Sequence, residues 1–365
     1  MSVPLFNTSS PLKALRGELD AAIARVLDSE RYILGPELAA FEQEFAEYCG
    51  ARRTVGVANG TDALTIALRA MGVGPGDDVI VPSFTFYASA EAIPPTGARP
   101  VFCDIDLETF CVTADTVKAA LTPRTKAVVA VDLFGNLAPV AEIEALGVPV
   151  LEDAAQAAGT TSRSGRAGSL GTAATFSFFP SKNLGCFGDG GAIVTSDEEI
   201  AERARMLRFH GSRDKVTFER IGYNSRLDEL QAAILRVQLP HLDGWAALRT
   251  AAGNAYQAAG LGNVVALPRP ADGVVPAWHL YVVRSARAAE LAAALTAAGV
   301  GNKAYYRTPL HRQPALREFA SDVVLAATDE AARTNLALPM SPALTIDQVH
   351  AVTAAARDEL GTLAA

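Results

Sequence analysis

The sequence predicts an α/β fold in which a mostly parallel β-sheet is covered by helices on both faces. Between about residues 54 and 195, short β-branched runs alternate with helical patterns. Several of these runs are apolar throughout, which is typical of strands that are buried on both faces. Beyond about residue 228 the pattern changes to alanine-rich helices. We therefore expect a large α/β domain over residues 1–240, including the N-terminal segment, and a smaller α+β domain over residues 241–365.

Seven strands are expected in the large domain. They are residues 54–59, 78–82, 99–105, 126–132, 148–153, 174–179 and 191–195. A helix that starts near Asp62 follows the first strand, because Leu64, Ala67, Leu68 and Met71 are spaced to form one apolar face.

Further helices are expected on both sides of the proposed boundary. Thr113 is a suitable N-cap for a helix that follows it. Residues 228–239 form a strongly helical stretch, which Pro240 either ends or kinks. In the small domain we expect helices at 245–259 and 287–298, with a strand at 279–284 between them.

The composition excludes several classes of protein. The chain has 365 residues, and its 40 Asp and Glu outnumber its 32 Lys and Arg, which gives a net charge of −8. Half of the residues are hydrophobic, so the chain is not intrinsically disordered. The acidic balance and the lack of a dense Lys/Arg run argue against a nucleic-acid partner. No apolar run of about 20 residues predicts a membrane span, and no signal-peptide pattern is found, so a cytoplasmic protein is expected.

The cysteines and histidines give no sign of a disulfide framework or a metal site. Cys49, Cys103, Cys111 and Cys186 include no C-x-x-C pair, so we expect buried, reduced thiols. The five histidines are scattered and match no metal-ligand spacing. No metal is expected.

The first segment with chemical potential is Asn59-Gly60-Thr61-Asp62, between a strand and a helix. A glycine at a helix start lets the backbone approach an anion, and the free amides and the helix dipole favour a phosphate there. Thr61 adds a hydroxyl donor. The alternative is an ordinary turn in which Thr61 or Asp62 caps the helix.

The second segment is VLEDAAQ (150–156). Asp153 ends an apolar strand, and open α/β sheets bind their ligands at the carboxyl ends of such strands. If a helix starts there, Gln156 lies one turn further on. The alternative is that Asp153 is a helix N-cap.

The third segment surrounds Lys182, which lies in a turn between two apolar strands and precedes four glycines within residues 185–191. Most lysines are solvated surface charges. This one has large apolar neighbours that could exclude water from it, namely Phe178, Phe179, Leu184 and Phe187. Desolvation lowers the pKa of an amine and makes it a usable nucleophile.

These three segments together fit one cofactor. Pyridoxal phosphate requires a phosphate cradle, a carboxylate for its pyridinium nitrogen and a lysine that forms a Schiff base. The combination is much more specific than any of its parts.

The sequence resembles the DegT/DnrJ/EryC1/StrS family of pyridoxal-phosphate-dependent sugar aminotransferases along nearly the whole chain. The motifs that carry the resemblance are GTDAL (60–64), GPGDDVIVPSFTF (74–86), EDAAQ (152–156), GSLG (168–171), PSKNLG (180–185), GDGG (188–191) and GYNSRLDELQA (222–232). The resemblance implies the type I aspartate-aminotransferase fold, with a large sheet domain and a smaller C-terminal domain.

The resemblance also implies a role for each matching residue of the cofactor site. Lys182 would bind the cofactor covalently, and Asp153 would pair with its ring nitrogen. Gln156 would lie against the ring or its hydroxyl group, and Phe86 would stack on the opposite face unless it is an ordinary core residue. The phosphate would be held by Gly60, Thr61, Asp62 and Ser177.

Other implied roles concern the partner subunit and the substrate. Asn224 would reach the phosphate of the partner subunit, which makes a homodimer the functional unit; alternatively, it caps the helix that begins near Leu227. Tyr306, Arg307 and His311 lie in a segment that lines the sugar-nucleotide site of relatives. Arg307 departs from the usual pattern, so it is either a diphosphate or carboxylate ligand or an exposed structural residue.

The implied activity is the amination of a nucleotide-linked keto sugar, with L-glutamate as amino donor. Relatives that act at C-4 often carry HP-x-K followed by a Glu-Gly-Gly segment. Here Lys182 is followed by Asn-Leu-Gly and then by Gly188-Asp189-Gly190-Gly191, which resembles enzymes that aminate a 3-keto sugar nucleotide, so a 3-keto substrate is favoured over a 4-keto one. A sugar dehydratase of the same fold would carry histidine in place of Lys182. A non-enzymatic regulator would need a DNA-binding module, and the roughly 30 residues before the matching region are too few.

Overall fold

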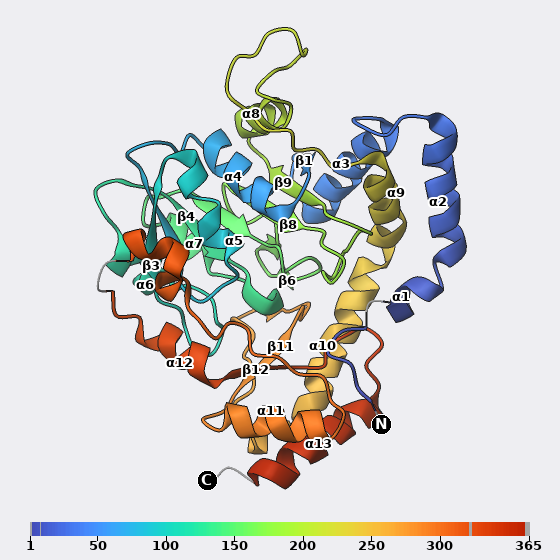
Figure 1. Ribbon diagram of the computed structural model, residues 1–365, viewed down its shortest axis with the longest axis vertical. Helices are drawn as coiled ribbons and strands as arrows, with labels where there is room; N and C mark the ends of the chain where they lie inside the picture. The colour runs from blue at the N-terminus through green and yellow to red at the C-terminus, as the bar shows by residue number, and fades with distance from the viewer. Residues whose placement is uncertain (1, 8, 321–322, 362–365) are drawn as a thin grey trace.

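A seven-stranded sheet forms the centre of the larger part of the molecule (Figure 1). The computed structural model describes residues 2–7, 9–320 and 323–361. In chain order the strands are β1 (Arg53–Val57), β2 (Asp78–Pro82), β3 (Arg99–Cys103), β4 (Thr125–Val131), β5 (Val150–Asp153), β8 (Ala173–Ser177) and β9 (Gly191–Thr195). All seven expected strands are present.

The sheet is mostly parallel, as predicted. Its order is β1-β9-β8-β5-β4-β2-β3, and only β9 runs antiparallel to its neighbours. Because β9 is reversed, its first residue, Gly191, pairs with Ser177 at the end of β8 and with Val57 at the end of β1. The ends of β1, β5 and β8 and the start of β9 therefore meet at one edge of the sheet.

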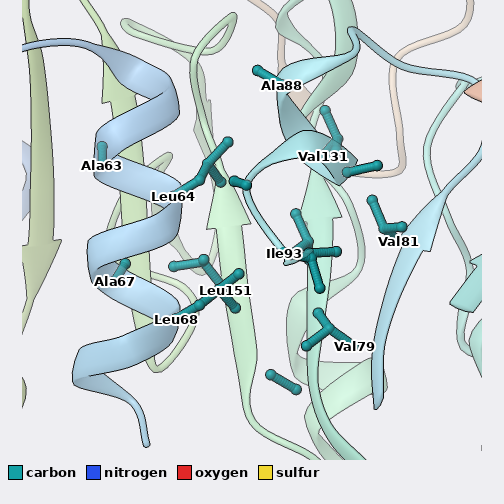
Figure 2. Close-up of a cluster of buried hydrophobic side chains, with 14 of the residues drawn as sticks. Ala63, Leu64, Ala67, Leu68, Val79, Val81, Ala88, Ile93, Val131 and Leu151 are labelled. Carbon is teal, nitrogen blue, oxygen red and sulfur yellow. The ribbon is translucent and has the colours of Figure 1, made fainter. Parts of the chain in front are cut away.

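Helices cover both faces of this sheet. They are α3 (Pro36–Cys49), α4 (Gly60–Ala70), α5 (Ala88–Glu91), α6 (Ala114–Ala120), α7 (Val140–Glu144), α8 (Glu198–Arg208) and α9 (Glu229–Gln238). The helix α2 (Arg16–Ser29) packs on the outside of α9. Figure 2 shows how α4 packs: Leu64 and Leu68 point from the helix toward Leu151 of β5 and its neighbouring strands. The apolar face of α4 matches the predicted one, and Thr113 caps α6 as expected.

The helix α4 begins two residues before its expected start. Asn59 is its N-cap: its side-chain Oδ1 accepts from the backbone N–H of Asp62 at 2.8 Å. The alternative in which Thr61 or Asp62 caps this helix is therefore wrong. Moving the cap to Asn59 places Gly60 and Thr61 in the first turn, where amides have no intrahelical acceptor.

Pro240 kinks the chain between two helices. The helix α9 ends at Gln238, a short 3₁₀ turn (Leu239–His241) contains the proline, and α10 (Leu242–Ala258) starts directly after it. The long α10 reaches from the large sheet into the C-terminal part (Figure 1).

The C-terminal part is built on a two-stranded antiparallel sheet, β11 (Tyr281–Arg284) and β12 (Asn335–Leu338). The elements around it are α11 (Ala288–Ala297), α12 (Ala326–Thr334) and α13 (Ile346–Leu360). Val3, from the other end of the chain, joins this core and bridges to Val300. The division at residue 240 stays a prediction, and the contact of Val3 shows that the N-terminal segment packs partly beyond it. The small elements not yet named are α1 (Ser9–Lys13), β6 (Thr161–Ser162), β7 (Gly165–Arg166) and β10 (Val274–Val275).

A buried carboxylate fixes α3 to α9. Glu229 accepts from three backbone N–H groups at the start of α3: those of Gly35 (2.8 Å), Glu37 (2.8 Å) and Leu38 (3.0 Å). Glu229→Ala would leave these donors without an acceptor, so we expect the free energy of unfolding to fall by about 3 kcal/mol in urea titrations at fixed protein concentration. The control is Glu290→Ala, which removes only an exposed ion pair and should leave stability unchanged. Equal effects of the two variants would contradict this role of Glu229.

Candidate active site

A cavity of about 1410 Å³ lies at the edge where the strand ends meet. Most of the residues predicted for the site lie on its wall: Gly60, Thr61, Asp62, Phe86, Asp153, Gln156, Ser177, Lys182, Tyr306 and Arg307. They come from five separate segments of the chain. The cavity is bounded on its other side by residues of the C-terminal part, so it lies between the two parts of the molecule.

One end of the cavity has the geometry of an anion cradle. Asn59 accepts hydrogen bonds from two early amides of α4: its Oδ1 accepts from the N–H of Asp62, and its backbone oxygen accepts from the N–H of Ala63. The amides of Gly60 and Thr61 are thereby left for a ligand. Ser177 lies directly beside them: a Cβ built on Gly60 would be 2.8 Å from the Cβ of Ser177. The sequence brings a helix N-terminus and two hydroxyl groups together at this point.

Gly60→Ala tests whether this close approach matters. The added methyl group would clash with Ser177 and push the first turn of α4 away from it. We expect affinity for pyridoxal phosphate to fall by about tenfold or more, measured by fluorescence titration of the cofactor-free protein. In the control Gly244→Ala, on α10, a Cβ would meet nothing within 4 Å. Unchanged affinity in Gly60→Ala would count against a phosphate at this cradle.

Asp153 is held in place by two hydrogen bonds. Its Oδ2 accepts from the Ser89 hydroxyl at 2.7 Å, and its Oδ1 accepts from the backbone N–H of Ala155 at 3.3 Å. Residues 155–159 form a turn rather than a helix, so the alternative of Asp153 as a helix N-cap is wrong. Burial raises the pKa of this carboxyl group, while Ser89, Ala155 and the charge of Lys182 oppose the shift. A buried carboxylate of this kind favours a cationic partner.

Lys182 lies on the cavity wall, in the turn between β8 and β9. Its Nζ makes no hydrogen bond to any residue that the structure describes. Burial lowers the pKa of its amine to about 8, and the charge of Asp153 partly opposes this shift. A larger part of the Lys182 population is therefore neutral and nucleophilic near pH 8 than for an ordinary lysine, as a Schiff-base lysine requires.

Gln156, Tyr306 and Phe86 shape the middle of the cavity. The side chain of Gln156 is fixed at both ends: its Oε1 accepts from the Phe134 amide at 2.9 Å, and its Nε2 donates to the Tyr306 hydroxyl at 3.1 Å. Phe86 is 56% exposed, so in this chain it lies on the cavity wall and not in the core. Its ring is 6.2 Å from that of Tyr306. An exposed aromatic face beside a fixed amide suits a flat ligand.

Two predicted residues lie outside the cavity wall. Asn224 is exposed, on the segment that leads into α9. His311 packs instead against Ser83, with its Nδ1 2.6 Å from the serine hydroxyl. Arg307 does line the cavity and is exposed. The phosphate contact of Asn224 and the substrate roles of His311 and Arg307 stay predictions.

Other residues of the site were not predicted from the sequence. Ser89 and His279 both belong to it: Ser89 binds Asp153, and His279 lies on the cavity wall close enough for the charge of Lys182 to lower its pKa. The motif that ends at Phe86 stops three residues before Ser89. The sequence pattern predicts that His279 begins a strand, but that strand starts at Tyr281. Only tertiary structure brings these side chains to the site.

One side chain joins the EDAAQ and GSLG motifs. Glu152, next to Asp153 but on the other face of β5, accepts from the amides of Gly168 (3.0 Å), Leu170 (2.7 Å) and Gly171 (2.7 Å). Burial raises its pKa to about 7 despite these bonds. Glu152 thus fixes the loop that packs under the strand carrying Asp153.

Neither a metal site nor a membrane-spanning helix is found in the part of the chain that the structure describes. No group of His, Cys, Asp and Glu there could hold a metal ion. No helix in the same residues combines the length and the apolarity needed to cross a membrane. All four cysteines are buried and unpaired, in agreement with the prediction of free thiols.

The fold and the site define an α/β enzyme of the type I aminotransferase class, with a lysine and a buried carboxyl group on the wall of one cavity. Comparison with known proteins gives the family. The DegT/DnrJ/EryC1/StrS aminotransferase family model matches residues 13–357, and the chain belongs to this family.

Individual relatives agree with this assignment. A Streptomyces venezuelae protein named dTDP-3-amino-3,4,6-trideoxy-alpha-D-glucose transaminase is 47% identical over 98% of this chain and 96% of its own. The Pseudomonas aeruginosa UDP-2-acetamido-2-deoxy-3-oxo-D-glucuronate aminotransferase is 41% identical over 93% and 96%. The crystal structure of S. venezuelae DesV in complex with a ketimine intermediate superposes with a TM-score of 0.95 at 46% identity, covering both chains completely.

Proposed function

We propose that this protein is a pyridoxal-phosphate-dependent aminotransferase that converts a nucleotide-linked 3-keto hexose to the 3-amino sugar, with L-glutamate as the amino donor. The observation that carries the proposal is the position of Lys182 and Asp153 on the wall of one cavity that also contains an anion cradle. A lysine, a carboxylate and a phosphate site in one cavity are the three things that this cofactor needs.

The described residues fit the cofactor. The amides of Gly60 and Thr61 and the hydroxyl of Ser177 would hold its phosphate, at a cradle that a Cβ on residue 60 would fill. Asp153 would face its ring nitrogen, and Phe86 and Gln156 would contact its ring. When bound, pyridoxal phosphate supplies an electron sink for the electron pair that is left when a proton is removed from the carbon bearing the amine.

The side chains of this chain would then divide the work. Asp153, as an anion in a dry site, stabilises positive charge on the ring nitrogen, and Ser89 keeps the carboxylate oriented. Lys182 has a pKa near the working pH, so it can take up and return a proton at Nζ. Gln156 is fixed by Phe134 and Tyr306 and provides a rigid polar contact.

The names of the relatives support the 3-keto substrate. The P. aeruginosa relative acts, by its name, on a 3-oxo sugar nucleotide, and the S. venezuelae relative is named for a 3-amino sugar. The Asn-Leu-Gly that follows Lys182 agrees with this preference. A dehydratase of the same fold is disfavoured because Lys182 is present, and the intact cavity disfavours a purely regulatory role.

The functional unit we propose is a cytoplasmic homodimer. The loop between α8 and α9 projects from the large domain (Figure 1) and carries strongly exposed apolar side chains, Val216 (81%), Phe218 (59%) and Ile221 (85%). Such side chains are typical of an interface. Asn224 closes this loop, and in a dimer it would reach the phosphate site of the other subunit.

The test is to reconstitute the protein with pyridoxal phosphate and follow the absorbance band of the lysine-bound cofactor. L-Glutamate should bleach the band, and a keto-sugar nucleotide should restore it. A panel of 3-keto and 4-keto sugar nucleotides, with the aminated carbon identified by NMR, then gives the position. No bleaching by any amino acid would refute the aminotransferase proposal, and amination at C-4 would refute the 3-keto assignment.

A further inference from the structure

The side chain of His279 is an unexplained polar group in the cavity. It is 4% exposed, it lies on the same wall as Lys182, and its ring stacks on Phe6 at 6.2 Å between centroids. Its Nδ1 is buried and has no hydrogen-bond partner among the residues that the structure describes. A buried, unpaired ring nitrogen is costly, so its position in a cavity requires an explanation.

The backbone that carries His279 is held rigidly in an unusual conformation. Trp278 has a positive φ of 22°, which is rare for a bulky residue. Gly135 makes this possible, since a Cβ there would lie 2.8 Å from the backbone nitrogen of Trp278 and 2.9 Å from that of His279. Asn183, directly after Lys182, donates to the backbone oxygen of Ala277 at 2.9 Å. Asn183 therefore ties the segment of Lys182 to the segment that leads into His279.

Arg249 lies behind this segment and is itself incompletely paired. It is buried on α10, it has no carboxylate partner among the described residues, and its NH1 group donates to the backbone oxygen of Trp278 at 3.1 Å. Its Nε–H is buried without an acceptor in the same part of the chain. The guanidinium is close enough for its charge to act on His279.

The two unpaired atoms complement each other. Arg249 Nε is a donor that lacks an acceptor, and His279 Nδ1 can serve as an acceptor only when it carries no proton. A hydrogen bond between them, direct or through one bridging water molecule, would satisfy both. In that arrangement the proton of the neutral imidazole is on Nε2. Burial and the positive charges of Lys182 and Arg249 all lower the pKa of His279 well below its ordinary value, so the ring stays neutral.

We infer that His279 is a neutral hydrogen-bond donor that presents Nε2–H to an oxygen atom of the reacting molecule beside Lys182, with Arg249 as the positioning residue that selects this tautomer. The inference rests on the proposed function, because that function supplies the molecule. Two oxygens have the right chemistry: a carboxylate oxygen of the amino donor and the carbonyl oxygen of the keto sugar. A donor that is already oriented in the cavity stabilises either of them without reorganisation.

The tautomer is tested without any turnover. In protein labelled with ¹⁵N-histidine, long-range NMR correlations should show His279 neutral, with the proton on Nε2, from about pH 6 to pH 9. The signal is assigned by its absence in His279→Gln. In Arg249→Met the preference for the Nε2–H form should weaken. Titration of His279 near its ordinary pKa, or a proton on Nδ1 in the wild-type protein, would overturn the inference.

The acceptor is identified by rapid-mixing measurement of the two half-reactions. We expect His279→Phe, which keeps the ring but has no donor, to slow one half-reaction by about 10²-fold, and His279→Gln to recover about tenfold of the loss. A slower reaction with L-glutamate indicates the carboxylate, and a slower reaction with the keto sugar indicates the carbonyl oxygen. The control is His350→Phe, at an exposed position on α13.

The outcomes separate the two hypotheses. Wild-type protein that shows no bleaching with any amino acid refutes the proposed function, whatever the tautomer of His279. If the wild-type protein turns over normally and both half-reactions are unchanged in His279→Phe, the role of His279 is refuted and the proposed function stands. If the His279 variants fold poorly, the signal can be assigned by substituting the other four histidines instead, so the NMR test of the wild-type protein still stands.

Discussion

Lys182→Ala is expected to abolish covalent binding of the cofactor and to lower transamination by at least about 10⁴-fold, because one side chain provides both the nucleophile and the acid–base group. The absorbance band of the lysine-bound cofactor should be missing, and reduction with borohydride should leave no label on the protein. The phosphate cradle at Gly60 is untouched in this variant, so the cofactor should still bind reversibly. Spectroscopy and equilibrium dialysis check the two halves of this prediction.

Lys303→Ala is the matched control, since Lys303 lines the same cavity but lies in the segment from the C-terminal part. It should keep the covalent band and the borohydride label. If the band is unchanged in Lys182→Ala, or is lost in Lys303→Ala, the Schiff-base lysine would be Lys303 and not Lys182. The lowered pKa of Lys182 favours Lys182, because a neutral amine is needed for attack on the cofactor.

The large sheet was predictable from the sequence for a simple physical reason. A strand buried on both faces must be apolar over most of its length, so runs such as residues 79–82 and 191–194 stand out. Periodicity alone does not give direction, and nothing in residues 191–195 indicates that β9 runs against its neighbours. That reversal matters, because it brings Gly191 beside Asn59: a Cβ on Gly191 would lie 2.4 Å from the backbone oxygen of Asn59.

The site was predictable where one short segment contains both the functional residue and its structural context. Asp153 ends a strand, Gly60 starts a helix, and Lys182 lies in a turn with apolar neighbours. His279 and Arg249 were not predictable, because their significance depends on contacts between distant segments. The position of His279 depends on a positive φ at Trp278 and on the missing side chain of Gly135, and neither can be inferred from the pattern HLYVVR.

Asp153→Asn is expected to have opposite effects on activity and stability. The amide is nearly isosteric and can still accept from Ser89, but it carries no charge to stabilise a protonated ring nitrogen. We expect kcat for the glutamate half-reaction to fall by about 10³-fold, with a smaller change in cofactor affinity. Asp132→Asn is the control. Asp132 directly follows β4, beside Asp153 at the end of β5, and its carboxyl group is also buried, but it does not line the cavity. It should keep most of the activity.

The stability of the cofactor-free protein should change in the other direction. Burial raises the pKa of Asp153 in the folded state, so the folded protein holds this proton more tightly than the unfolded chain does. Stability from this group is therefore present at low pH and is lost as the pH rises through the folded-state pKa. Asparagine does not ionise, so Asp153→Asn should unfold at a higher temperature than the wild type at pH 7–8, with the difference vanishing in acid. A melting temperature of Asp153→Asn below that of the wild type at neutral pH would show that the ionised carboxylate stabilises the cofactor-free protein. That result would contradict the view that Asp153 lowers stability and is kept for its action on the cofactor.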